Sequence, residues 1–439
     1  MANFAPLSSA DEPSVAALIA ARPHLSMHAF DGLVLEGVPL SHIADQLGTP
    51  VWVYGAGTMR ARLAALKAAL HGLGAEVHYA VKANDHLAVL KVFAQGGAGA
   101  DVVSGGEFLR ARKAGIAADH IVFSGVGKTT DEIALALGEG IFQLNVESAA
   151  ELDMISQVAT TLGRTARVAL RINPDVDAGT HAKITTGKAE NKFGIPYDDA
   201  AALYAHAAGL PGVEPVGIAL HIGSQILNTA PYRAAFARAA ALIRALRAGG
   251  QTVTRMDCGG GIGIGYGDEP GASPDALAGA MRQAFGAMGL QLMVEPGRWL
   301  VGPAGLLLSS VVLTKGDARF VVIDAAMNDL IRPAMYDAWH GIVPLSAGNA
   351  VGATSLVDVV GPICESSDTF ATGRALPAMP AGSRVAILDA GAYGAVMAST
   401  YNARPQPAIA MVDGDRWTVI RRRQTYEDLW ASETIPDFL

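Results

Sequence analysis

Short β-rich apolar segments alternate with longer Ala/Leu-rich segments along the chain after Trp52. Short apolar runs bounded by turn residues are typical of buried strands, whereas an apolar period of about 3.6 residues is typical of helices. We predict strands at Val77–Val81, Asp101–Val103, Ile121–Phe123, Phe142–Asn145, Val168–Arg171, Gly217–His221, Arg255–Cys258 and Leu292–Glu295. Because parallel strands need long crossover connections, which are usually helical, this order predicts an α/β fold, a parallel (β/α)8 barrel of the TIM type.

Helices are predicted in the longer segments that separate these strands. Those with the clearest helical period are Gly106–Ala114, Asp131–Leu137, Ala149–Leu162 and Tyr232–Ala248. The first of them is entered through Ser104, whose hydroxyl can accept a hydrogen bond from the first helical turn. Each predicted helix therefore has a place in a strand-helix repeat.

After about Gly305 the pattern changes to alternating strands separated by turns, which predicts a second, mostly β domain. Its predicted strands are Phe320–Asp324, Leu356–Val360, Arg384–Asp389, Ala408–Val412 and Trp417–Arg421. Near the N-terminus, Gly32–Gly37 is predicted as a further strand that can pair into this β domain, followed by a helix at Leu40–Leu47. We therefore predict an N-terminal segment at 1–48, a barrel at 49–304 and a C-terminal β domain at 305–439.

Composition and charge narrow the class of protein. The chain has 439 residues, of which 51% are hydrophobic and 17% are charged, so a sizeable core can form and a disordered chain is excluded. Its formal charge is −8, which makes nucleic acid and anionic membrane surfaces poor partners. Two cysteines, Cys258 and Cys364, are too few for a disulfide framework or a Cys-rich zinc site, and we predict no metal.

No export or membrane segment is expected. Asp11 and Glu12 precede the first basic residue, Arg22, which reverses the charge order of a secretory signal. The uncharged apolar run Trp299–Thr314 is shorter than the roughly 20 residues of a membrane helix and contains two glycines and a proline. We therefore expect a cytoplasmic protein.

Polar residues and glycines follow the predicted barrel strands, at the face where (β/α)8 barrels carry their active sites. In chain order they are Lys82, Ser104, Arg171, His221, Gly259-Gly260-Gly261 and Glu295. A desolvated lysine can form a Schiff base, and a glycine run lets backbone N–H groups approach a phosphate. Taken alone, each also has an ordinary explanation, because lysine is usually solvated and glycine serves many turns.

Two segments resemble nucleotide-binding motifs but lack residues that these motifs require. Gly125-Val126-Gly127-Lys128-Thr129 resembles the end of a P-loop, but Val122 stands where the first glycine is required. The glycine run near residue 260 does not satisfy the dinucleotide fingerprint, because Ile264 and Tyr266 stand at the later positions. A Schiff-base lysine, a phosphate cradle and an inward carboxylate together indicate pyridoxal phosphate instead.

Two further residues fit that cofactor. Glu295 can keep the pyridine nitrogen protonated, and His221 can stack on the ring. Each also has a plain structural alternative, namely a carboxylate paired with an arginine and a hydrogen-bonded core histidine.

The order of several motifs resembles that of the diaminopimelate decarboxylases. These motifs are Tyr79-Ala80-Val81-Lys82-Ala83-Asn84, Lys192-Phe193-Gly194-Ile195, His221-Ile222-Gly223-Ser224-Gln225, Gly259-Gly260-Gly261, Glu295-Pro296-Gly297-Arg298, Arg332-Pro333-Ala334-Met335-Tyr336, Cys364-Glu365 and Asp389-Ala390-Gly391-Ala392-Tyr393. The resemblance covers about residues 30–430 and implies an alanine-racemase-like barrel with a β domain. Asn191, where serine is common, and Cys258 before the glycines are small departures from the family pattern.

The resemblance also implies roles for individual residues. Lys82 would carry the cofactor, and the catalytic residues would be Lys82, Cys364, His221 and Glu295. Cofactor contacts would come from Lys82, His221, Ser224, Gly259, Gly260, Gly261, Glu295, Gly297, Arg298 and Tyr393. Substrate contacts would come from Arg298, Arg332, Tyr336, Glu365 and Tyr393. A lone cysteine is more often a small buried apolar residue, but a thiol is also a suitable general acid, and Cys364 would protonate the carbon that loses carbon dioxide.

The implied reaction is decarboxylation of meso-2,6-diaminopimelate to L-lysine, the last step of bacterial lysine synthesis. The family's Cys-Glu segment is delivered across a dimer interface, so a homodimer with shared sites is expected. Alternatives are a sister decarboxylase for ornithine, arginine or carboxynorspermidine, and a catalytically silent homologue that regulates a true decarboxylase. Arg332 and Tyr336 argue against simple diamine-forming substrates, since a second substrate carboxylate is what needs a bidentate cation.

Overall fold

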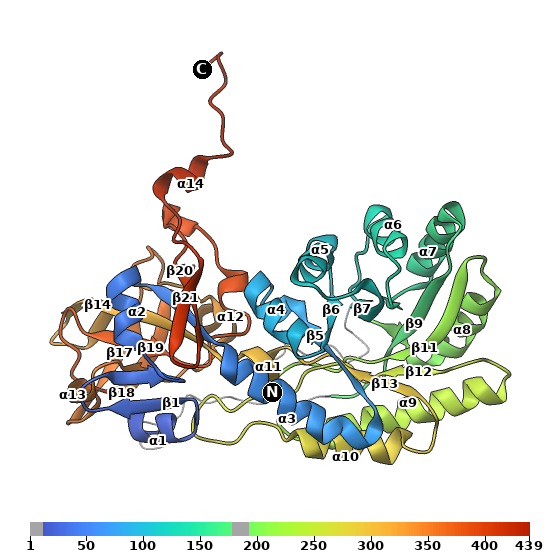
Figure 1. Cartoon of the computed structure of the whole chain (residues 1–439), viewed down its shortest axis with the longest axis horizontal. Coiled ribbons are helices and arrows are strands. Elements are labelled where there is room, and N and C mark those ends of the chain that lie inside the picture. The colour runs from blue at the N-terminus through green and yellow to red at the C-terminus, as the bar shows by residue number, and fades with distance from the viewer. Residues whose placement is uncertain (1–11, 178–192) are drawn as a thin grey trace. The chain divides into compact units, whose positions relative to one another are not determined.

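The computed structural model describes residues 12–177 and 193–439, which form two compact units (Figure 1). The first unit contains Arg60–Ile264 and Gly271–Leu300, and the second contains 12–59, Gly265–Pro270 and Val301–Leu439. The predicted domain limits at 48 and 304 stay predictions. Residues 1–11 of the predicted N-terminal segment, and Asn191 and Lys192 of the family motif, lie outside the described residues.

The first unit contains a closed barrel, built in its described part from eight parallel strands. They are β5 (Glu76–Ala80), β6 (Gly99–Val102), β7 (Ile121–Phe123), β8 (Gln143–Val146), β9 (Ala166–Asn173), β11 (Val213–Ala219), β12 (Arg255–Asp257) and β13 (Gln291–Val294). The circle closes where β13 pairs in parallel with β5, and a two-residue strand, β10 (Ile195–Pro196), pairs with β9. Every predicted barrel strand overlaps an observed one, and the predicted fold class is confirmed.

Helices connect these strands and surround them in Figure 1. They are α4 (Leu87–Gln95), α5 (Gly105–Ala114), α6 (Thr130–Gly138), α7 (Ala149–Leu162), α8 (Ala200–Gly209), α9 (Ala230–Ala248) and α10 (Pro274–Phe285), with α3 (Ala56–Leu70) before the first strand and α11 (Arg298–Val301) after the last. Ser104 caps α5 as predicted, since its hydroxyl accepts a hydrogen bond from the Glu107 N–H at 3.2 Å. Such caps satisfy N–H groups that have no partner within the helix and fix where each helix leaves its strand.

The second unit is built mainly from one large sheet. Its strands are β4 (Val51–Gly55), β14 (Gly305–Lys315), β15 (Phe320–Ile323), β16 (Ile342–Pro344), β17 (Thr354–Val360), β18 (Thr369–Pro377), β19 (Arg384–Ile387), β20 (Ala408–Asp413) and β21 (Arg416–Arg421). The main path runs β18-β17-β15-β14-β4-β20-β21, and β19 joins β14 to β16. The five predicted C-terminal strands are therefore present, and β14, β16 and β18 are additional. Short helices α12 (Arg332–Tyr336), α13 (Ala347–Ala350) and α14 (Tyr426–Trp430) complete this part.

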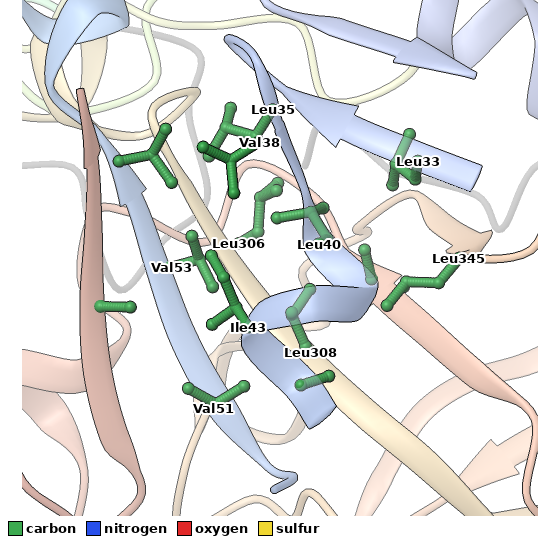
Figure 2. Close-up of a cluster of buried hydrophobic side chains, with 14 of the residues drawn as sticks. Leu33, Leu35, Val38, Leu40, Ile43, Val51, Val53, Leu306, Leu308 and Leu345 are labelled. Carbon is green, nitrogen blue, oxygen red and sulfur yellow. The ribbon is translucent and has the colours of Figure 1, made fainter. Parts of the chain in front are cut away.

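The N-terminal strand joins this unit by packing. Strand β2 (Gly32–Leu35) pairs with β1 (Leu25–His28) and β3 (Val38–Pro39) in a separate three-stranded sheet, so the expected pairing into the large sheet is not how it joins the unit. Figure 2 shows the buried cluster that connects the two sheets. It includes Leu33, Leu35, Leu40 and Ile43 together with Val51, Val53, Leu306 and Leu308. Full burial of one such side chain contributes roughly 1.5–3 kcal/mol, so the cluster attaches the N-terminal strands and helices α1 (Val15–Ala20) and α2 (Leu40–Leu47) to the large sheet.

Within the described parts of the chain, no helix combines the length and the apolar character that crossing a membrane would require.

Candidate active site

The C-terminal ends of the barrel strands bring together most of the predicted site residues. Lys82 lies in a short 3-10 turn after β5, His221 follows β11, and the glycine run follows β12. Glu295 comes directly after β13 and is followed by Arg298 in α11. The sequence therefore placed these residues at the correct face of the barrel.

Lys82 is held by a buried carboxylate on the neighbouring strand. Its Nζ lies 3.3 Å from Oδ2 of Asp101, and the exposed side-chain fractions are 34% and 0%. Ala80 and Asp101 are register partners in strands β5 and β6. The other carboxylate oxygen of Asp101 is buried without a hydrogen-bond partner among the described residues. Lys82 is thus a half-buried amine that Asp101 holds at the barrel mouth.

Glu295 lies in a buried polar network inside the barrel. Nδ2 of Asn145 lies 2.9 Å from Oδ2 of Asp257, 3.3 Å from Oε1 of Glu295 and 3.1 Å from Oγ of Ser124. Burial, aided by the nearby charges of Asp101 and Asp257, raises the pKa of Glu295 well above its ordinary range. Burial raises the pKa of Asp257 as well. Burial and the repulsion between two adjacent buried charges therefore both favour the protonated form of these carboxyls.

His221 is a neutral imidazole at this site. Desolvation, followed by the positive charges of Lys82 and Arg171, lowers its pKa well below the ordinary range. Its Nδ1 accepts a hydrogen bond from the Gly260 N–H at 3.4 Å. That contact assigns the ring proton to Nε2 and ties the imidazole to the glycine run.

The glycine run is a close-packed junction of three loops. A Cβ on Gly259 would collide with the backbone oxygen of Leu220, one on Gly260 with that of Glu295, and one on Gly261 with that of Gly223. Gly259 and Gly261 also have positive φ values of 70° and 94°. Because glycine has no side chain, the backbone N–H groups of this run stay accessible, and a binding site for an anion needs accessible N–H groups.

Arg298 and Ser224 lie together beside this junction. Nη2 of Arg298 donates to Oγ of Ser224 at 3.2 Å, and the arginine is 7% exposed. Gly297 is equally constrained, since a Cβ there would lie 2.9 Å from Cβ of Ala83 and 3.2 Å from Cβ of Ala80. The motif that contains Arg298 therefore packs directly against the turn that carries Lys82.

The remaining predicted residues belong to the second unit. Arg332 and Tyr336 begin and end α12, and Arg332 is almost fully buried. Tyr393 has a positive φ of 56°. Asp389, at the start of its motif, is buried and ion-paired with Arg22, whose Nε donates at 3.0 Å. The motif's loop is thus fixed from the N-terminal segment, by a contact that no local sequence pattern reveals.

Cys364 and Glu365 lie on an organised loop. The buried Asp368 accepts hydrogen bonds from the backbone N–H groups of Ile363 at 2.6 Å and Met327 at 2.7 Å. Cys364 itself is exposed, which rules out the buried apolar alternative for this thiol, whereas Cys258 is buried. Tyr401 donates to Glu365 at 2.5 Å.

Glu365 forms part of the wall of an open cavity of about 550 Å³ in the second unit. The other lining residues are Met327, Asn328, Ile331, Ser399, Thr400 and Tyr401.

Two basic residues near the barrel mouth have structural partners. Nζ of Lys128 contacts Oε1 of Glu151 at 2.6 Å and two backbone oxygens, and both side chains are buried. The lysine of the apparent P-loop ending is therefore held in a buried ion pair. Arg171 pairs with Glu147 at 2.7 Å, and Glu147 also accepts from the Gly194 N–H at 3.0 Å. Both pairs organise loops around the mouth.

Comparisons with known proteins extend over both units. Residues 56–302 match the family described as "Pyridoxal-dependent decarboxylase, pyridoxal binding domain". The diaminopimelate decarboxylase of Zymomonas mobilis is 47% identical over 414 residues, which cover 93% of this chain and 98% of that protein. The diaminopimelate decarboxylase of Neisseria meningitidis serogroup A is 45% identical over 403 residues, covering 91% and 98%. The crystal structure of diaminopimelate decarboxylase from Helicobacter pylori complexed with L-lysine has a TM-score of 0.87 and 40% identity, covering 90% of this chain and 99% of that one.

Proposed function

This chain belongs to the diaminopimelate decarboxylase family, and from this premise we propose how its barrel site works. The enzyme decarboxylates meso-2,6-diaminopimelate to L-lysine and carbon dioxide, the final step of lysine synthesis. The observation that carries the proposal is the Lys82 amine, held on buried Asp101 at the same barrel mouth as buried Glu295 and the bare glycine backbone.

The residues present fit pyridoxal 5'-phosphate. Lys82 offers the amine, and Glu295 offers a carboxyl to the ring nitrogen. The bare glycine backbone, with Ser224 and Arg298, offers N–H, O–H and guanidinium donors to a phosphate. When bound, this cofactor supplies an electron sink that stabilises the carbanion left by carbon dioxide.

Residues of the barrel determine which groups around the proposed cofactor site carry a charge. The polar network can hold a proton at Glu295, because burial disfavours its charged form and Asn145 hydrogen-bonds both carboxyls. His221 remains neutral and presents a flat ring that packs without adding charge. Asp101 keeps the Lys82 amine at the mouth.

Cys364 is proposed as the proton donor to the carbon that loses carbon dioxide. A thiol titrates close enough to neutrality to transfer a proton efficiently. Support comes from its exposure on a loop that Asp368 holds rigid. We further propose a homodimer in which this loop completes the partner's site, and a cytoplasmic location, where a free thiol persists.

Substrate selection is proposed to rest on Arg298, Arg332, Tyr336, Glu365 and Tyr393. Diaminopimelate has a second ammonium and a second carboxylate beyond the reacting carbon. A substrate without that carboxylate lacks one charge-assisted contact with an arginine. Loss of one charge-assisted contact costs roughly 1.5–3 kcal/mol, about a tenfold to hundredfold penalty in kcat/KM.

The test is product analysis with purified protein, pyridoxal phosphate and meso-diaminopimelate, with L-ornithine and L-arginine as competing substrates. We expect L-lysine as product, and Arg332→Ala should lower kcat/KM while the cofactor stays bound. Borohydride reduction and peptide mapping should place the cofactor on Lys82. Comparable kcat/KM for ornithine and diaminopimelate would favour a sister decarboxylase, and absence of any product would favour a silent homologue.

A further inference from the structure

Arg332 is fixed in place by a buried histidine. Its Nη1 lies 2.6 Å from Nε2 of His340, and Nδ1 of the same imidazole lies 2.8 Å from the backbone oxygen of Leu388. Arg332 and His340 are 5% and 1% exposed. A carbonyl oxygen can only accept, so Nδ1 of His340 is the donor to Leu388. In a neutral imidazole Nε2 is then the acceptor, which is what the Arg332 N–H requires.

An aromatic ring covers the same pair. The guanidinium carbon of Arg332 lies 4.8 Å from the ring centroid of Tyr266. That ring also meets the imidazole of His340 edge-on, with centroids 5.2 Å apart and an interplanar angle of 79°. A cation over an aromatic face is attracted to it, so Tyr266 restricts the plane of the guanidinium while His340 fixes one of its N–H groups.

The backbone around His340 is also held. Its carbonyl oxygen accepts from Nη1 of Arg374 at 2.8 Å, and the Leu388 N–H donates to the oxygen of Gly341 at 2.9 Å. The imidazole therefore has little freedom to follow a moving arginine.

We propose that His340 is a positioning residue that presents Arg332 to an anionic group of the substrate. This rests on the substrate-binding role proposed above for Arg332. A neutral imidazole orients the guanidinium without cancelling its charge, whereas a carboxylate in the same place would form an ion pair with it. Because the arginine is oriented before the substrate arrives, less conformational freedom is lost on binding.

Two substitutions at His340 separate this role from simple packing. In His340→Gln the amide oxygen can take the place of Nε2 and accept from Arg332. In His340→Asn the shorter amide keeps the donor to Leu388 but cannot reach Arg332. We expect His340→Asn to raise the KM for meso-diaminopimelate about tenfold while kcat stays within about twofold, and His340→Gln to stay within about threefold of wild type in both. Equal losses in both variants, or a wild-type KM in His340→Asn, would overturn the inference.

Combination with Arg332→Ala identifies the residue through which His340 acts. If His340 works through Arg332, His340→Asn should raise KM no further in the Arg332→Ala background, whereas independent roles would multiply the two effects. An unchanged KM in Arg332→Ala alone would refute the proposed role of Arg332. If Arg332→Ala raises the KM but His340→Asn leaves the KM at the wild-type value, only the positioning role of His340 is refuted.

If neither His340 variant folds, Tyr266→Leu decides, because it leaves the buried pair in place and removes only the ring over Arg332. A rise in KM at constant kcat is expected, and an unchanged KM would refute the proposal that Tyr266 and His340 orient Arg332.

Discussion

Replacing Gly297 by alanine should move the turn that carries Lys82. The added Cβ would lie 2.9 Å from Cβ of Ala83 and 3.2 Å from Cβ of Ala80. Carbon atoms pack best at about 3.5–4.0 Å, so the turn must shift by roughly 0.6–1.1 Å. The Ala80 N–H donates to the Pro296 oxygen at 3.1 Å, which opposes that separation.

The expected magnitude follows from this geometry. Overpacking of this kind costs about 1–3 kcal/mol, which for a unit of this size corresponds to a fall in Tm of roughly 2–12 °C. A displacement near 1 Å at a reacting amine lowers kcat/KM about 10- to 100-fold. Gly279→Ala, inside α10 with no heavy atom within 4 Å of the new Cβ, is the matched control and should instead raise stability by about 0.5–1 kcal/mol.

A compensating substitution distinguishes steric displacement from lost cofactor contact. Ala83→Gly removes the nearest atom and should restore part of the Tm and of kcat/KM in the Gly297→Ala background. A loss caused by contact between the new methyl group and the cofactor would not be relieved. Wild-type Tm and kcat/KM in Gly297→Ala, measured by thermal unfolding and steady-state kinetics, would refute the reasoning.

Three further predictions concern the thiol, a buried ion pair and a half-buried carboxyl. Cys364→Ala should keep the cofactor but lose most turnover, and mixing it with Lys82→Ala should restore some activity; inactive mixed dimers would refute shared sites. Lys128→Met should lower the free energy of unfolding in urea by about 3–5 kcal/mol, because Glu151 stays buried without its partner, and adding Glu151→Leu should recover most of it. Burial raises the pKa of Glu107 from 4.5 to about 7. The native state therefore binds this proton more tightly than the unfolded chain, stability falls as pH rises through that interval, and Glu107→Gln should remove this slope from urea unfolding.

Sequence periodicity was sufficient for the barrel because each of its strands is a local apolar run between helices. It was less informative for the second unit. Strand β14 lies in the uncharged run Trp299–Thr314, which has no polar alternation, since most of its residues are buried on both faces. Strand β4 stands just before the barrel in sequence but pairs with β14 and β20, and no local pattern specifies that partner choice.

For the candidate site, too, the sequence predicted some residues and not others. Residues at strand ends were found because a barrel places all of them on one face. Asp101 and Asn145 were missed, although a polar residue flanked by apolar neighbours in a buried strand is a signal that it points into the barrel. His340 and Arg22 give no such signal, because their roles depend on Arg332 and Asp389, which only the folded chain brings to them.

The position of β4 has a consequence for the order in which the chain folds during synthesis. This strand, made early, lies in the interior of the large sheet between β14 and β20, and β20 is among the last elements to be made. The barrel segments can close as soon as β13 is complete, whereas β4 must wait with both edges unpaired. Unpaired apolar strands associate with other chains. A nascent or truncated chain that ends before Ala408 would therefore leave β4 open on one side, and the last strands protect the first part of the chain from aggregation.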